Sequence, residues 1–355
     1  MINPEKQFLC RFYLKKKISA VIFLSFFFFT ISYSQDTVNL IPGSQKPIES
    51  KPGNYVDTPS NVVPGPMHGP DDLRPNKKRI RLITAINIVG YGGSLIAFNQ
   101  AWYANYPRSS FHFFNDNAEW LQVDKIGHGW AAYNTGKASA AMWQWAGLSQ
   151  KKAALIGGFS GAAYLTVIEI LDGFSSQWGF SWGDMTANVV GSGLFISQEL
   201  LWQEQRIQYK FSFHRNTYDE PMLDKRADDL FGKSWYERML KDYNAQAYWL
   251  SANLKSFFKQ SNLPAWLNIA AGYGADGMFG GFENKWTDAQ GNPVTRYDIQ
   301  RKRQFYLAPD IDFTKIKTNK KWLRTVFTFL NAFKCPAPAL MLDSKGKFKA
   351  YAVYF

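Results

Sequence analysis

The sequence is short of cysteine and histidine, and each shortage excludes a class of protein. Only two cysteines occur in 355 residues. Cys10 precedes an apolar run typical of an export signal, so Cys335 would remain alone after export, and a disulfide framework within the mature chain is excluded. No cysteine directly follows that run to accept a lipid. Of the four histidines, only His128 lies in the predicted bundle helices, so a di-iron bundle, which needs Glu-x-x-His on two helices, is also disfavoured.

The beginning of the chain has the order of a secretory signal peptide. Lysines at 15–17 precede the apolar run 18–31, and small residues follow at Ser32 and Ser34. A basic start, an apolar middle and a small-x-small end predict cleavage after Ser34, which removes the signal peptide 1–34. An uncleaved anchor helix is the alternative, but the apolar run is short for a membrane span.

Acidic residues are outnumbered by basic ones. The chain has 41 Lys and Arg against 28 Asp and Glu, and without residues 1–34 the count is 36 against 27, a net charge of +9. A basic exported protein can contact anionic lipid head groups or phosphate-bearing glycans. Because export removes the opportunity to meet nucleic acid, we expect membrane or envelope lipids as partners and no nucleic acid.

Composition divides the remainder of the chain into three parts. Residues 35–79 hold 8 of the 16 prolines and few large apolar residues, which predicts a disordered, proline-rich linker. Residues 80–206 contain four long apolar stretches, which predict a helical bundle. Residues 207–355 mix strand-like and helix-like patterns. The predicted fold class is therefore α+β, mainly α: a four-helix bundle with a polar core, followed by a smaller mixed region of short strands and helices.

The bundle helices are rich in small residues. The first is uncharged over 82–107 and could cross or lie in a membrane, whereas the third is uncharged only over 153–168, which is short for a span. Gly157 and Gly161 form a small-xxx-small pair, which favours close helix approach. The expected helices are 80–104, 118–146, 150–173 and 182–206.

The mixed region is expected to contain about five short strands, over 206–215, 267–274, 303–316, 339–343 and 347–355. Helices are expected over 234–258, with a turn near Asn244, and over 319–333. Five strands are too few for a membrane barrel, so we expect a small sheet that rests on the bundle or on a membrane surface.

Three of the expected bundle helices each carry a polar pair. The pairs are Asp124 with His128, Glu169 with Asp172, and Asp184 with Asn188. A spacing of three or four residues places both members on one side of a helix. If these sides meet, several carboxylates are enclosed together, which requires protons, a cation or paired donors. Lys125, Gly191 and Ser192 adjoin the pairs and are expected to complete a binding site.

Each of these residues also has a purely structural interpretation. Asp184 could cap its helix after Ser181, Asp172 could mark a helix end, and Asp124 with His128 could form a local pair on a solvated face. Three pairs of this kind on three helices favour a shared site instead.

The shared site allows two kinds of chemistry. A divalent metal held by Asp124, His128, Glu169 and Asp184 could activate a water for hydrolysis. A hydrogen-bonded network that fixes the bundle or recognises a polar head group needs fewer assumptions. The candidate catalytic residues, if the protein is an enzyme, are Asp124, His128, Glu169, Asp172 and Asp184.

Three segments, "DKIGH", "EILDG" and "SWGDMTANVVG", resemble the predicted periplasmic lipoprotein family, domain of unknown function 2279. The pattern also distantly resembles the VanZ-like membrane proteins. The resemblance covers about 80–210 and implies a common helical bundle and an envelope location in a Gram-negative, Bacteroidota-like bacterium. Two departures are the missing lipid-accepting cysteine and the absence of an arginine before the last segment. The resemblance implies no particular reaction.

The sequence therefore predicts an exported, membrane-associated protein of the cell envelope, in the periplasm or at the outer membrane. Envelope organisation, or recognition of a polar or lipid head group, is the predicted role. The alternative is a metal-assisted hydrolase that acts on an envelope lipid or glycan, so the sequence leaves open whether the protein is an enzyme.

Overall fold

A computed structural model of the chain describes residues 75–99, 107–288 and 290–354. Within these residues the fold combines eight α-helices with a six-stranded antiparallel sheet, so the predicted α+β class is confirmed. The predicted signal peptide and all but the last residues of the predicted linker lie outside the described residues.

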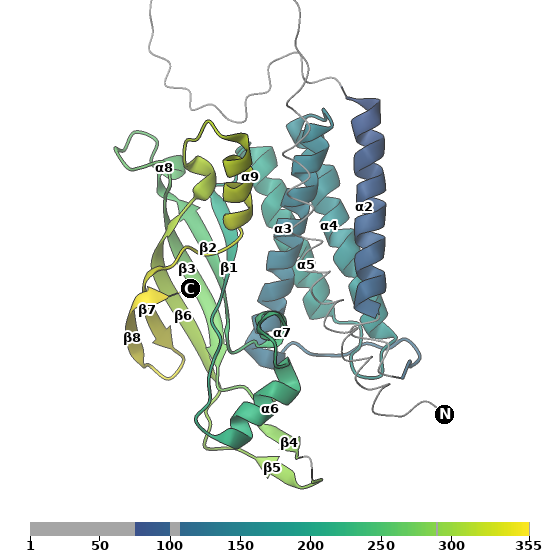
Figure 1. The fold of residues 1–355 in the computed structure, drawn as a ribbon, viewed down its shortest axis with the longest axis vertical. Coiled ribbons are helices and arrows are strands. Elements are labelled where there is room, and N and C mark those ends of the chain that lie inside the picture. The colour runs from purple at the N-terminus through teal and green to yellow at the C-terminus, as the bar shows by residue number, and fades with distance from the viewer. Residues whose placement is uncertain (1–74, 100–106, 289, 355) are drawn as a thin grey trace, which may run out of the picture.

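Four long helices lie side by side next to the sheet (Figure 1). Their bounds are Lys77–Phe98 (α2), Val123–Trp145 (α3), Gln150–Gly173 (α4) and Trp182–Leu201 (α5). Helix α2 begins inside the predicted linker because the Asn76 side chain accepts hydrogen bonds from the backbone N–H groups of Lys78 and Arg79.

Helices α3, α4 and α5 pack closely because glycines lie at their contacts. A Cβ added to Gly157 would lie 2.5 Å from the Ala140 backbone nitrogen on α3. A Cβ added to Gly191 would lie 2.0 Å from the Gly129 carbonyl oxygen. The close approach predicted from the small residues is therefore present. Helix α2 packs against the other three from one side. Its Ile83 contacts the end of α3, and its Tyr91 stacks on Tyr164 of α4.

Much of the outer surface of these helices is apolar. Among the described helices, α4 has the length and composition that a membrane span requires, and 33% of its most apolar window is buried. The exposed apolar side chains include Ile88, Val89 and Ile96 on α2, Phe159, Val167 and Ile170 on α4, and Val189, Val190 and Leu201 on α5.

The sheet has the strand order β1-β2-β3-β6-β7-β8, and each neighbouring pair is antiparallel. A separate hairpin pairs two shorter strands. The strands are β1 Ile207–Phe213, β2 Gln246–Asn253, β3 Leu267–Asp276, β4 Lys285–Thr287, β5 Pro293–Thr295, β6 Lys302–Ile311, β7 Ala337–Asp343 and β8 Phe348–Tyr354.

The remaining helices are short. They are α6 Pro221–Phe231, α7 Trp235–Lys241, α8 Leu254–Phe257 and α9 Lys321–Leu330, with 3-10 turns η3 Glu119–Gln122 and η4 Phe313–Lys315. The predicted helix over 234–258 is wrong in its second half, where β2 begins at Gln246. Both faces of β2 are covered there, with Tyr248 against α3 and Trp249 in the opposite core. A strand buried on both faces lacks the alternation that identifies strands in a sequence.

The sheet holds the first turns of α3 in place. Val123 lies in one core with Phe211 of β1 and Tyr248 of β2, and the Tyr209 hydroxyl donates to the Ile126 carbonyl oxygen at 2.8 Å. The helical and sheet regions therefore meet at the beginning of α3, where the polar residues predicted to form a site are located.

Candidate functional site

Lys125 is the centre of a group of carboxylates at the beginning of α3. Its Nζ atom lies 2.7 Å from Asp116 Oδ2, 2.8 Å from Asp184 Oδ1 and 3.2 Å from Asp124 Oδ2. The three acids come from three places: the segment before α3, the first turn of α5, and α3 itself. One ammonium thus holds these elements together and offsets much of the repulsion among the acids.

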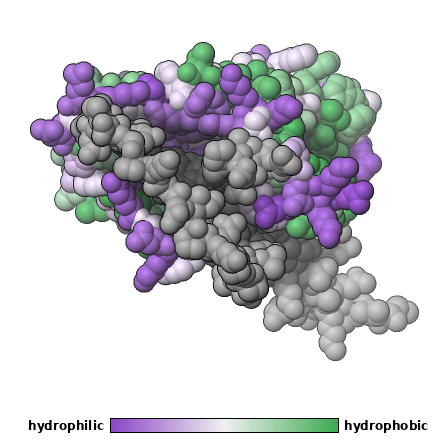
Figure 2. All heavy atoms as spheres, turned by 90° about the horizontal axis from the view of Figure 1, so that it is seen from above, coloured by the Kyte–Doolittle hydropathy of each residue, from purple (hydrophilic) through white to green (hydrophobic). Residues whose placement is uncertain are grey.

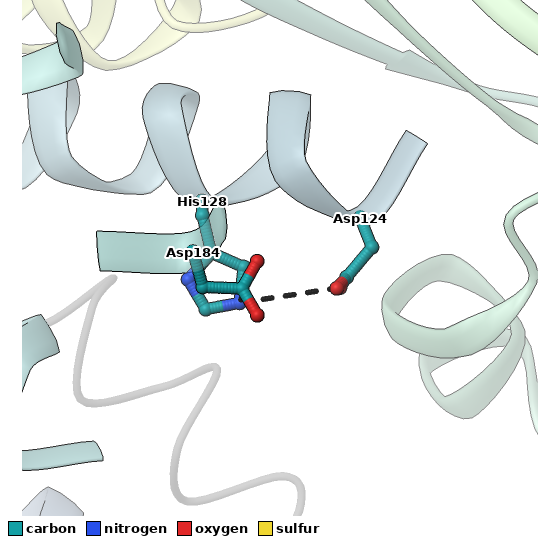
Figure 3. A group of neighbouring side chains, drawn as sticks. All are labelled: Asp124, His128 and Asp184. Carbon is teal, nitrogen blue, oxygen red and sulfur yellow. Dashed lines mark ion pairs between the residues drawn. The ribbon is translucent and has the colours of Figure 1, made fainter. Parts of the chain in front are cut away.

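His128 lies one turn beyond Asp124 and extends the group toward Asp184 of α5 (Figure 3) and toward Glu169 of α4. Its Nδ1 atom is 3.3 Å from Asn188 Oδ1 and 3.5 Å from Glu169 Oε1. Its Nε2 atom is 3.8 Å from Asp184 Oδ1 and 3.9 Å from Asp124 Oδ1. The structure thus brings together residues from the three pairs that the sequence places on separate helices.

A left-handed turn precedes the site. Trp120, Leu121 and Gln122 have φ angles of 48°, 50° and 66°, a conformation that costs roughly 1–2 kcal/mol per residue for side chains with a Cβ. The C-terminal region holds this turn: the Gly281 carbonyl accepts from the Trp120 N–H at 2.8 Å, and Arg303 donates to Gln122 Oε1 at 2.7 Å. Strain supported in this way is frequent at functional sites, and here it sets the position of Asp124.

The first turn of α5 positions Asp184 through Ser181. The Ser181 hydroxyl accepts from the Asp184 backbone N–H at 3.1 Å and donates to Asp116 Oδ1 at 2.6 Å. The capping role and the site role of this segment are therefore both present, because the backbone of Asp184 is capped while its carboxylate binds Lys125.

The closeness of so many charges changes several pKa values. Burial raises the pKa of Glu169 to about 8; the nearby acids raise this pKa further, whereas His128 lowers it. Burial likewise raises the pKa of Asp184 to about 6. Burial alone would lower the pKa of His128, but Asp184 and Asp124 outweigh it and raise the value to about 9. Burial also opposes ionisation of Asp124, yet its pKa is lowered because His128 and Lys125 stabilise the carboxylate.

Three buried polar atoms of α4 and α5 lack a hydrogen-bond partner among the described residues: Glu169 Oε1, which lies in an ion pair with His128, Asn188 Nδ2 and Ser192 Oγ. These residues are 1%, 0% and 3% exposed. An unpartnered buried polar atom costs about 1–3 kcal/mol, so the group has capacity to bind a donor and an acceptor from a ligand or water.

Asp124 and His128 form the open side of the site. Their side chains are 19% and 21% exposed, whereas that of Asp184 is 7% exposed. One ligand-type atom from each of these three residues lies within 4.8 Å of the others, which is a donor set suited to a metal ion. Glu169, the fourth predicted ligand, lies on the closed side.

Two of the predicted site residues act indirectly. Asp172 is three residues beyond Glu169 on α4, and its charge helps to raise the pKa of Glu169. Gly191 lies against the Gly129 backbone, so its contribution is to let α5 approach α3.

Sequence reasoning missed three members of the group. Asp116 binds Lys125, the Tyr243 hydroxyl donates to Asp124 Oδ1 at 2.7 Å, and burial together with Asp124 raises the pKa of Glu119 to about 7. The acidic segment "NDNAE" before α3 was the available signal for Asp116 and Glu119. Tyr243 lies in the C-terminal region and had no sequence signal.

Exposed aromatic side chains lie beside the site, on the segment that contains Asp116 and at the beginning of α5. The rings of Phe113 and Trp182 stack with centroids 6.1 Å apart, and the residues are 61% and 65% exposed. Phe180 contacts both rings. The polar group therefore borders an apolar surface.

Comparison with known proteins identifies one family. Neither the comparison with curated proteins nor that with solved structures gave a match. The sequence profile of a family described as predicted periplasmic lipoprotein (domain of unknown function 2279) matches residues 112–198. That segment includes Asp116 and all of α3 and α4 together with most of α5, so it contains nearly the whole site. The part of the chain that carries the site is therefore similar to a family described as periplasmic.

Proposed function

We propose that this chain is a cell-envelope protein that recognises a polar head group at the α3–α5 site, without catalysing a reaction. The observation that carries the proposal is the arrangement of the group: Asp124 and His128 are partly exposed, and three buried polar atoms of α4 and α5 have no hydrogen-bond partner in the described part of the chain. A ligand that offers both donors and acceptors would form hydrogen bonds with those atoms and so remove the free-energy penalty of leaving them unpartnered.

The charges of the site favour a zwitterionic ligand. Near neutral pH Glu169 is largely protonated and His128 is charged, so the carboxylates around Lys125 are almost balanced by two cations. A ligand with an ammonium and a phosphate could place the ammonium against Asp124 and the phosphate against His128, each as a charge-assisted hydrogen bond.

The surroundings favour a lipid as the source of that head group. Phe113 and Trp182 expose stacked rings beside the site, and aromatic rings of this kind are typical of the level where acyl chains meet head groups. The periplasmic location in the description of the matched family is consistent with this.

A second candidate function is metal-assisted hydrolysis of an envelope lipid or glycan. The convergence of Asp124, His128 and Asp184 within 4.8 Å supports it. A metal ion would compete with Lys125 for the same carboxylates, and His128 would first lose its proton, because its pKa is raised to about 9. Head-group recognition requires neither change.

The test is a thermal-shift titration of the exported chain with phosphoethanolamine, and separately with Zn²⁺ and Mg²⁺. Phosphoethanolamine is expected to raise the Tm of the wild type but not of Asp124→Asn or His128→Gln. Asp229→Asn, an exposed position on α6, serves as the control and should respond like the wild type.

Other outcomes decide against this proposal. Stoichiometric zinc that is retained through purification and lost in both variants would favour the hydrolase. If neither ligand changes the Tm and both variants are merely less stable, the group is a structural network and the recognition proposal is wrong.

A further inference from the structure

The sheet is apolar on its exposed face as well as on its buried face, where an aromatic core surrounds a few charged side chains. On most antiparallel sheets of soluble proteins the solvent side carries polar residues. Here the large apolar residues on one side of β2, β3, β6, β7 and β8 are between 42% and 63% exposed. We call them the outer sheet face: Leu250, Ile269, Phe305, Leu307, Leu340, Leu342 and Phe348.

The strand register makes this face continuous. Leu307 on β6 pairs with Ala271 on β3 and with Leu340 on β7. A second row pairs Phe305 with Leu342, and Leu342 pairs with Phe348 on β8. Directly opposite residues on adjacent strands lie about 4.5–5.5 Å apart, so these side chains form one surface instead of scattered exposed residues.

The opposite face of the sheet encloses charges. Asp310 on β6 lies 2.8 Å from Lys210 Nζ and 3.7 Å from Lys334 Nζ, and all three side chains are fully buried. The Ser251 hydroxyl donates to Asp310 Oδ2 at 2.6 Å. These charges lie beside the aromatic core of Trp249 and Tyr306, so this face is closed, and the apolar residues of the outer sheet face are not needed to form it.

Part of the same face is already used inside the molecule. Tyr248 and Tyr273, in the row of Phe305, are covered by the beginning of α3 and the turn before it. From β6 onward no described element covers the face, and the six-stranded sheet extends beyond the helices (Figure 1). The exposed residues on β6, β7 and β8 therefore continue the apolar surface that packs against α3 on β2 and β3.

Basic residues are concentrated in the same segment of the chain. Residues 301–355 contain 12 Lys and Arg against 3 Asp and Glu, so this segment contributes +9 to the net charge of +13. Lys345 and Lys347 lie in the β7–β8 turn, at one end of the apolar rows, and α9 connects the strands at their other end.

Helix α9 has the composition of an interfacial helix. Trp322, Val326 and Leu330 are exposed at a spacing of four residues, so they form one stripe. Lys321 and Arg324 are exposed on the same helix. Basic residues flanking an exposed apolar stripe are typical of helices that lie at a membrane surface. Seen from above in Figure 2, hydrophilic and hydrophobic side chains both lie on the described surface, and the hydrophobic ones gather toward the upper right.

From these observations we infer that the outer sheet face contacts the acyl chains of an anionic envelope membrane, with α9 and the β7–β8 turn at the level of the head groups. The basic charge selects this occupant over a second copy of the chain, because a symmetric dimer would place two strongly basic segments together, whereas anionic lipids attract them. The inference does not depend on the head-group site of α3–α5.

The test is flotation of the exported chain with vesicles of phosphatidylethanolamine and phosphatidylglycerol. The double variant Leu307→Lys, Leu340→Lys is expected to bind these vesicles at least about tenfold more weakly, since two apolar side chains no longer enter the acyl layer. The matched control, Met222→Lys with Leu240→Lys, changes two exposed apolar residues of α6 and α7 and should bind within about twofold of the wild type.

A second measurement tests the same contact without the double variant, so its result does not depend on whether that variant folds. The variant Leu340→Cys, in a Cys335→Ser background, is labelled with an environment-sensitive fluorophore, and its emission should shift to the blue with vesicles. The emission of the same label on Asp229→Cys, in the same background, should not shift. Unchanged flotation of a folded double variant would overturn the inference. So would a lipid-free dimer that the double variant dissociates, which would assign the face to a second copy.

Discussion

The molecule contains two buried groups in which lysines bind aspartates, and they differ in how completely they are closed. In the sheet, Lys210, Asp310 and Lys334 are fully buried, and Asp310 also accepts from Ser251 and from the Cys335 backbone N–H. At the beginning of α3, Lys125 binds three acids, but neighbouring polar atoms lack partners and part of the group is exposed.

This difference separates a structural group from a candidate binding group. A closed and satisfied network stabilises a single arrangement of the core and has no capacity for a ligand. A partly open network with unpartnered atoms and shifted pKa values is typical of a site that binds or reacts. Charge and residue type alone would not distinguish the two groups.

The largest effect is expected from opening the closed group. Asp310→Ala leaves two buried ammonium groups without their carboxylate, so the free energy of unfolding should fall by about 3–5 kcal/mol. Urea denaturation followed by circular dichroism measures it. Asp229→Ala, at an exposed position of α6, should change stability by no more than about 0.5 kcal/mol. A similar small change for Asp310→Ala would mean that the closed group is not structural.

A smaller effect is expected from the corresponding change in the open group. Lys125→Met should lower the free energy of unfolding by about 2–4 kcal/mol, because solvent and ions reach Asp124 and offset part of the lost charge. Added Mg²⁺ or Ca²⁺ should recover part of this loss in Lys125→Met but not in Lys210→Met. Equal recovery in both variants, measured by urea denaturation, would contradict the distinction between an open and a closed group.

The open group should also make stability depend on pH. The pKa of His128 is raised from 6.5 to about 9, so its stabilising contribution is complete below pH 6.5 and is lost as the pH rises through 9. The raised pKa of Glu169, about 8, likewise makes the folded state less stable as the pH rises toward 8. His128→Gln should therefore flatten the fall in urea midpoint between pH 6.5 and 9. An unchanged slope in the variant would place the titrating group elsewhere.

The smallest effect is expected from two serines. Ser192→Ala removes a buried hydroxyl without a partner, so stability should change by about 0.5 kcal/mol or less, or rise slightly. Ser251→Ala removes a donor to Asp310 and should cost about 1–2 kcal/mol. Differential scanning calorimetry of the two variants measures this contrast, and equal losses would mean that Ser192 is partnered after all.

Local periodicity explains what the sequence could predict. Asp124 and His128, like Asp184 and Asn188, share a face because four residues complete about one helical turn, so each pair could be found without knowing the fold. Glycine spacing similarly predicted that α4 packs closely against another helix, and the structure identifies that helix as α3.

The parts of the site and of the fold that the sequence did not predict depend on contacts between segments that are distant in the sequence. Asp116 reaches Lys125 from outside any helix, and Tyr243 reaches Asp124 across 119 positions of sequence, so no spacing rule connects them. Strand β2 was predicted as helix because burial on both sides removes its alternation.

The left-handed turn at Trp120–Leu121–Gln122 has a consequence for the order of events during synthesis. Its supports, Gly281 and Arg303, leave the ribosome well after α3, α4 and α5. The three helices can therefore associate early, while the carboxylate of Asp124 reaches its final place only when the last third of the chain has folded against it. A nascent or truncated chain would carry every acidic residue of the helices and still lack a finished site.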